Sequence, residues 1–215
     1  MKKIDDELWE TEPEYPFPGL STHAYLWLAP GGNVLFYNTT HEFELDRMAE
    51  LGGVAHHYLS HQDEIAPSLQ AIKERFGSTL HAHATEADLV AEVASVDDAF
   101  ADRHITATGI DVIPTPGHTP GSTCFLAPVS GRKFLFTGDT IYVAPDGHWR
   151  AGYIPGVSDR AQLAATLADL ATVQPDVVVS SAFTGDSGVT ELGDRTWADC
   201  VEEALHALEP EATRS

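Results

Sequence analysis

Cysteine and long apolar runs are scarce in this sequence, and each scarcity excludes a class of protein. Two cysteines occur among 215 residues, and neither belongs to a C-x-x-C pair, so we expect free thiols at Cys124 and Cys200 rather than a disulfide framework. No apolar run approaches the roughly 20 residues of a membrane-spanning helix. The first residues also lack the apolar stretch of a signal peptide. We therefore expect a cytoplasmic protein with no membrane partner.

Basic residues are also few, because 12 lysines and arginines face 33 acidic residues, for a net charge of −21. Such a surface repels polyanions, which argues against nucleic acid and anionic membranes as partners. The acidic residues are scattered rather than gathered into a tail, as in an ordinary well-solvated surface. The expected partner is a small-molecule substrate or ligand, and the sequence indicates no particular oligomeric state.

The chain has the size and the 43% hydrophobic content of one substantial domain. No linker divides it, so we predict a single domain over residues 1–215 with its core at about 20–208. Apolar patterning predicts strands at 24–29, 34–37, 54–59, 79–83, 109–114, 123–127, 133–136 and 176–180. Helices are predicted at 42–51, 65–76, 86–93, after Ser158 as its cap, and at 196–208. This mixture favours an α/β (α+β) fold in which two mixed sheets lie between helical layers.

Two turn motifs carry the strongest chemical signal. Pro116-Gly117-His118-Thr119-Pro120-Gly121-Ser122 is followed, after a short apolar strand, by Thr137-Gly138-Asp139-Thr140. Prolines and glycines around a histidine restrict the backbone and aim the ring, and imidazole with carboxylate suits zinc or iron better than calcium or magnesium. A lone histidine in such a turn would be an incidental surface residue. The two motifs in this order favour a metal site.

With Leu59-Ser60-His61 at the end of a predicted strand, these motifs resemble those of the metallo-β-lactamase fold superfamily. The resemblance covers the chain from about Ala24 to Gly185. It implies an αββα sandwich that holds one or two metals at the strand ends.

The first motif of that superfamily usually reads Thr-His-x-His-x-Asp-His, and this chain departs from it. In the natural register His61 is the first His and Asp63 replaces the second, while Ile65 and Ala66 replace the last two ligands. Residues 181–185 lack the usual late His, and Asn38 replaces an early Asp. Because the lost ligands belong to the second metal, the resemblance implies one divalent metal held by a smaller set: His61, Asp63, His118 and Asp139. Zinc is the favoured metal, and iron and manganese are alternatives. A site that binds no metal is the remaining alternative.

A second register makes His61 the second His, Asp63 the Asp and Glu64 the third ligand, with Leu59 at the first His. The first register agrees better with a helix that starts near Glu64. Both registers retain the same four expected ligands.

Other histidines and aromatic residues are candidates for roles near this site. His81 and His83 alternate along one strand face and could supply a replacement ligand, although a polar core contact is the commoner outcome. His23, His41, His104 and His206 are expected to be ordinary surface or cap residues. The long aromatic loop after Asp139 is expected to border the cleft. Its candidates for substrate contact are His148, Trp149, Arg150 and Tyr153. Packing of Trp149 and Tyr153 onto the sandwich is the alternative.

Hydrolysis is the expected reaction class, since a metal with an open position lowers the pKa of its water toward neutrality. Asp63 or Asp139 would act as the catalytic carboxylate that takes up the proton. Esters, thioesters, lactones and amides are the candidate substrates. Two alternatives stay open. One is a noncatalytic protein that binds a ligand or partner through the cleft that holds the metals in the superfamily, and the other is an iron-dependent redox protein.

Overall fold

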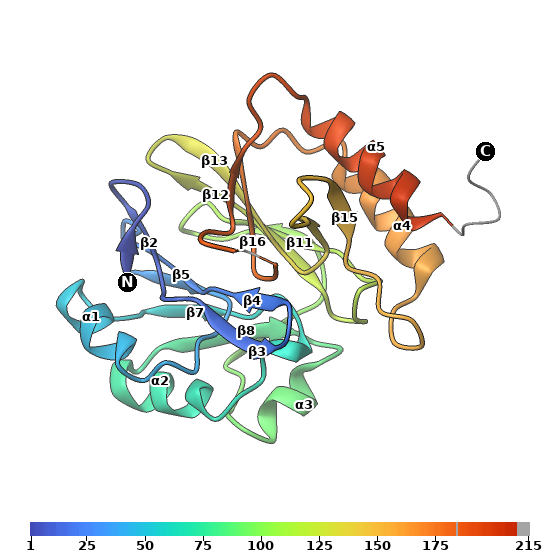
Figure 1. Cartoon of the computed structure of the whole chain (residues 1–215). Helices are drawn as coiled ribbons and strands as arrows, with labels where there is room; N and C mark the ends of the chain where they lie inside the picture. Colours follow the sequence, from blue (N-terminus) through green and yellow to red (C-terminus); the bar gives the residue numbers. More distant parts are fainter. Residues whose placement is uncertain (184, 210–215) are drawn as a thin grey trace.

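The apolar strand segments assemble into two mixed β-sheets in the computed structural model, which describes residues 1–183 and 185–209 (Figure 1). In this part of the chain, the first sheet has the order β1-β2-β5-β6-β7-β8-β9 and the second β10-β11-β12-β13-β16-β17. The strands of the first sheet are Lys2–Lys3, Leu8–Glu10, Tyr25–Trp27, Val34–Phe36, His56–Tyr58, Thr79–His83 and Asp98–Phe100. Those of the second are His104–Ile105, Asp111–Pro114, Thr123–Val129, Arg132–Gly138, Val177–Ser180 and Val189–Glu191. Two smaller hairpins pair β3 (Glu14–Phe17) with β4 (Leu20–Thr22) and β14 (Ile141–Val143) with β15 (Trp149–Ala151).

Aromatic side chains join the two sheets face to face. Phe36 of β6 stacks on Phe136 of β13, with ring centroids 4.0 Å apart, and Phe125 of β12 packs against Phe36 and Tyr58. Every residue of β6 and of β16 is buried, because these central strands meet the other sheet on one face and helices on the other. The core therefore lies both between the sheets and beneath the helices.

Helices cover the outer face of each sheet, as Figure 1 shows. The helices are α1 (Glu44–Glu50), α2 (Ser68–Phe76), α3 (Ala87–Ala91), α4 (Arg160–Leu170) and α5 (Trp197–Leu208). Leu69 of α2 and Val90 of α3 pack with Leu80 of β8, whereas Leu163 of α4 and Val201 of α5 pack with the second sheet. The predicted αββα sandwich is confirmed. None of the helices in the described residues has the length and apolarity needed to cross a bilayer.

Two local features differ from the sequence predictions. The first sheet begins with β1 and β2, before the core boundary predicted at about residue 20, and Leu8 is fully buried. Such short strands between charged residues carry no readable alternation, so their pairing with β5 comes from tertiary structure. Asp159, not Ser158, caps α4 by accepting a hydrogen bond from Gln162 N. Ser158 donates to the backbone carbonyl of His118 instead, at 2.8 Å.

Parallel pairing brings several strand ends to one edge of the sandwich. β6, β7 and β8 run parallel in the first sheet, and β13 runs parallel to β16 in the second. Carboxyl ends of parallel strands meet at the same sheet edge, where open α/β sheets commonly bind ligands. Residues that directly follow β7, β13 and β16 are therefore close in space.

Candidate metal centre and its cavity

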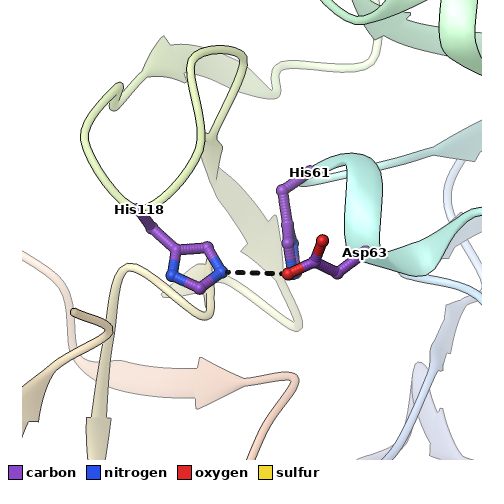
Figure 2. A group of neighbouring side chains, drawn as sticks. All are labelled: His61, Asp63 and His118. Atoms are coloured by element: carbon purple, nitrogen blue, oxygen red, sulfur yellow. Dashed lines mark ion pairs between the residues drawn. The ribbon is translucent and has the colours of Figure 1, made fainter. Parts of the chain in front are cut away.

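His61 and His118 come from different sheets and converge at this edge. His61 follows β7 and precedes the short 3₁₀ helix Gln62–Glu64 that carries Asp63, while His118 lies in the loop between β11 and β12. Ligand atoms of His61, Asp63 and His118 all lie within 4.8 Å of one another. Figure 2 shows the His118 ring and the Asp63 carboxylate facing each other from their two elements, beside the His61 ring. The structure therefore brings together these three predicted ligands.

Asp139, the fourth predicted ligand, completes the group at slightly longer range. Its Oδ2 lies 3.6 Å from His61 Nε2 and 3.9 Å from His118 Nε2, and Asp63 Oδ2 lies 3.7 Å from His118 Nε2. These separations exceed ordinary hydrogen-bond lengths. They are close to the roughly 3.4 Å that separates two N or O ligands of one tetrahedral zinc ion, given bond lengths of about 2.1 Å.

The His118 ring presents a free nitrogen to this group. Its Nδ1–H donates to Gly152 O at 2.5 Å, which leaves the lone pair of Nε2 facing the carboxylates. That Nε2 is buried and has no hydrogen-bond partner among the described residues. A buried polar atom without a partner calls for an explanation, and the donor set around it fits a divalent transition metal.

Glycines create the space that these contacts need. A Cβ on Gly152 would lie 1.8 Å from the carbonyl oxygen of Asp139, and a Cβ on Gly138, whose φ is +54°, would lie 2.3 Å from Ser60 Oγ. The backbone therefore passes the site at distances that only glycine permits.

A second layer of polar groups orients His61. Its Nδ1–H donates to Ser60 Oγ at 2.7 Å, and the Ser60 hydroxyl in turn donates to Glu64 Oε1. Glu64 Oε1 also lies 3.3 Å from His61 Nδ1, and its other oxygen accepts from the Ser60 backbone N–H at 2.9 Å. This relay leaves His61 Nε2 directed at Asp139, and when a metal displaces the proton from that nitrogen the ring is the Nδ1–H tautomer that a metal ligand needs.

Charge distribution keeps the carboxylates ionised. Burial by itself raises the pKa of Asp139, but the His61 and His118 rings and the Ser181 hydroxyl lower it to about 2. The His118 ring likewise holds the pKa of Asp63 below its usual value. Burial lowers the pKa of His61, yet the carboxylates of Asp139 and Glu64 outweigh burial and raise that pKa well above its usual value.

The cluster opens into a cavity of about 630 Å³. The β3–β4 hairpin supplies Pro16, Phe17 and Leu20 to its wall. Tyr142 and Phe183, whose rings stack at 4.5 Å, supply another wall. This mainly apolar lining with a few polar groups at one end is typical of a small-molecule site.

Of the four residues expected to contact substrate, Tyr153 lines this cavity and three lie elsewhere. His148 is exposed and contacts Glu203 of α5 at 2.5 Å, while Arg150 contacts Asp146. Trp149 is buried against Trp197 of α5. Strand β15 packs against α5, so Trp149 and the preceding His148 contact that helix rather than the cavity.

Sequence reasoning missed Ser181 and His23, and considered Glu64 only as a metal ligand in the second register. Ser181 donates to Asp139 Oδ1, and Glu64 orients His61 as described above. His23, expected at the surface or in a cap, is 3% exposed and lines the cavity. Its position directly before the apolar run at 24–29 was the available signal, since a polar residue at a strand start is often buried with a partner.

An αββα sandwich with a histidine and carboxylate cluster at its strand ends defines a class of proteins that typically bind divalent metals. The chain belongs to the metallo-beta-lactamase superfamily, whose family model matches residues 48–182. Both cysteines are free, as expected.

Two curated relatives share part of the chain, and both are hydrolases by name. The hydroxyacylglutathione hydrolase of Rhizobium meliloti (strain 1021) is 34% identical over 104 residues, which is 46% of this chain and 38% of that enzyme. The hydroxyacylglutathione hydrolase of Pseudomonas entomophila (strain L48) is 31% identical over 94 residues, or 44% of this chain and 34% of that enzyme. The matches thus span well under half the length of either relative.

Solved structures share the fold over nearly the whole chain. A metallo-beta-lactamase from Pontibacter korlensis is similar with a TM-score of 0.75 and 19% identity, over 96% of this chain and 97% of that one. An archaeal metallo-beta-lactamase superfamily protein from Sulfolobus tokodaii has a TM-score of 0.66 and 16% identity, over 95% and 87%. At these identities the likeness shows the fold alone.

Proposed function

We propose that this protein is a single-domain metal-dependent hydrolase that cleaves an ester, thioester, lactone or amide of a small molecule. His61, Asp63 and His118 would hold one divalent metal, with Asp139 beside them. Zinc is the metal that this mixed donor set favours, with iron and manganese as alternatives. The buried, partnerless Nε2 of His118, which faces two carboxylates at 3.7 and 3.9 Å, is the observation that carries the proposal.

A single metal is favoured over two by the residues near the cluster. Asn38 stands where the superfamily usually has an Asp in its early strand-end motif. Its side-chain amide donates hydrogen bonds to Glu64 O and Ser68 Oγ, at 2.9 and 3.0 Å. Ser181 occupies Oδ1 of Asp139, the oxygen directed away from both histidines. Ala66 lines the cavity with a methyl group where the superfamily motif carries a ligand.

When bound, the metal would supply Lewis acidity toward a carbonyl oxygen and an activated water. The chain's own residues would then move the proton. Asp63 is half-exposed in the cavity wall and ionised at neutral pH, so the carboxylate oxygen that does not bind the metal is available to accept a proton from the attacking water. The apolar walls would exclude bulk water and orient the acyl body of the substrate.

Metal content and hydrolysis test this proposal together. Protein purified without an affinity metal column is expected to carry close to one equivalent of zinc, iron or manganese by inductively coupled plasma mass spectrometry. It should also hydrolyse at least one member of a panel of activated esters, thioesters, lactones and amides.

The matched variant is His118→Asn, which keeps a donor for Gly152 O and removes the free ring nitrogen. It should lose both the metal and the hydrolysis. Absence of metal from both proteins would contradict the proposal and favour a noncatalytic binding protein. Iron with a visible spectrum that responds to dithionite would instead favour redox chemistry.

A further inference from the structure

His23 presents a second partnerless imidazole nitrogen in the same cavity. The ring belongs to a residue that is 3% exposed and that lines the cavity with the metal cluster. Its Nδ1 lies 2.6 Å from the backbone carbonyl oxygen of Thr11. A carbonyl only accepts, so Nδ1 carries the proton, and Nε2 of the neutral ring is a free acceptor. That Nε2 is buried and has no partner among the described residues.

The backbone places His23 beside the reacting end of the cavity. His23 N–H donates to Ser181 O at 3.3 Å, and Thr22 forms a bridge with Ala182. Ser181 in turn donates its hydroxyl to Asp139. Residues 181–182 therefore contact both the His23 segment and the Asp139 carboxylate, and His23 and Asp139 line the same cavity.

Within residues 1–183 and 185–209, the surroundings of the ring supply no partner for Nε2. His23 contacts the Thr11 carbonyl through its ring and the Ser181 carbonyl through its backbone N–H, and the Tyr25 ring is tilted against it at 6.3 Å between centroids. On the hairpin side the cavity wall is formed by apolar Pro16, Phe17 and Leu20 together with Glu14 and Thr22. The carboxylate of Glu14 bonds to Thr39 and Thr40 rather than to His23. A buried acceptor in apolar surroundings costs free energy unless a donor reaches it.

We infer that Nε2 of His23 accepts a hydrogen bond from the substrate, so that the cavity selects acyl compounds with a hydroxyl or amide N–H on an otherwise apolar body. The inference rests on the proposed hydrolase function and assigns the substrate class for that site. His23 is a specificity-determining residue here and takes no part in proton transfer. A site with a buried acceptor discriminates strongly against analogues that lack the donor, because the acceptor then stays unpaired.

The test compares p-nitrophenyl butyrate with its 2-hydroxy, 3-hydroxy and 3-acetamido derivatives. The wild-type protein should prefer at least one donor-bearing ester by about tenfold in kcat/KM. His23→Asn keeps a donor near the Nδ1 position for Thr11 O and removes the Nε2 acceptor, so the preference should fall to near one. His23→Gln carries an amide oxygen near the Nε2 position and should retain a preference. Thermal melts check that both variants fold.

Nitrogen NMR gives a readout that needs no turnover. In protein labelled with ¹⁵N-histidine, the methyl ketone analogue of the preferred ester, which has no leaving group, should shift the Nε2 resonance of His23, and 2-pentanone, which lacks the donor, should not. Equal hydrolysis of all four esters, an unchanged preference in His23→Asn, or no Nε2 shift would overturn the inference while leaving the hydrolase proposal intact. A selective Nε2 shift in a protein that hydrolyses neither these esters nor any thioester, lactone or amide of the panel would overturn the proposed function and support the binding role of His23.

Discussion

Two histidine clusters lie in this molecule, and their ring nitrogens are used in opposite ways. In the edge cluster, formed by His56, His81 and Asp98, His81 lies 2.8 Å from Asp98 through Nδ1 and 3.0 Å from His56 through Nε2. In the cavity cluster, formed by His61, Asp63 and His118, the corresponding separations are longer and His118 Nε2 has no partner among the described residues. Residue types are nearly the same, so composition alone does not distinguish a metal centre.

Topology explains the difference. The edge cluster lies on adjacent parallel strands, where Tyr58 is opposite His81 and His81 is opposite Asp98. Neighbouring strands are about 4.8 Å apart, so side chains on one face reach each other and saturate their hydrogen bonds. The cavity cluster comes from loops of two different sheets, which leaves a gap between the ligand atoms. A site for an ion therefore forms where elements converge and not where they pair.

The largest expected effect separates the two clusters by metal binding. Zinc at about 1,000 times its dissociation constant should raise the free energy of unfolding by about 4 kcal/mol, because it binds the folded state. His118→Asn should abolish that rise. Chemical denaturation of metal-free protein with and without zinc measures it.

His81→Asn is the matched control, since it removes Nε2 from the edge cluster and keeps a donor for Asp98. It should retain the full stabilisation by zinc. An equal loss of stabilisation in both variants would show that the edge cluster also binds zinc and would remove the distinction drawn above.

His57 offers a third arrangement, with a pH-dependent consequence. The ring is buried on the other face of β7, its Nε2–H donates to Tyr37 O at 2.8 Å, and burial lowers its pKa from 6.5 to about 4. Between these values the unfolded chain binds the proton and the folded chain does not, so stability falls as the pH drops through this window. The loss at pH 4 relative to pH 7 is about 3 kcal/mol.

His57→Gln keeps a side-chain donor for Tyr37 O and removes the titration. The free energy of unfolding of this variant, measured by urea denaturation from pH 4 to pH 7, should depend less steeply on pH than that of the wild type. Parallel curves for the two proteins would mean that His57 is protonated in the folded state as readily as in the unfolded chain.

The sequence predicted the parts of the site that depend on local motifs, and it missed those that depend on tertiary contacts. Strand-end turns with Pro, Gly and His located His118 and Asp139, because such turns encode their own backbone conformation. His23 N–H bonds to Ser181 and Thr22 forms a bridge with Ala182, both far along the chain, so the place of His23 before an apolar strand signals its burial but not these contacts. Trp149 points to α5, a helix that follows later, so this side chain packs on the core, which was the alternative considered for it, while Tyr153 of the same loop lines the cavity.

A smaller effect is expected for the relay behind His61. Glu64→Gln keeps the shape of the side chain but removes the charge that accepts from the Ser60 hydroxyl, so His61 is held less firmly as the Nδ1–H tautomer. Loss of such an outer partner typically weakens metal affinity 10–100-fold, which a competition titration with a chromophoric chelator would detect. Glu74→Gln, on the exposed face of α2, is the control and should leave the affinity unchanged. Unchanged affinity in Glu64→Gln would mean that Ser60 alone orients the ring.

The smallest effect is expected at His148, which lies in the same loop region as Tyr153 but on the opposite side of the β14–β15 hairpin. Its ion pair with Glu203 is exposed, and exposed pairs contribute at most about 1 kcal/mol. His148→Ala should therefore change stability by less than that and leave kcat/KM within about twofold, whereas Tyr153→Ala should raise KM because it removes a cavity wall. Steady-state kinetics of the wild type and of both variants on one ester measure these two effects. A tenfold rise in KM for His148→Ala would mean that substrates extend past the hairpin toward α5, and the cavity would then be only part of the binding surface.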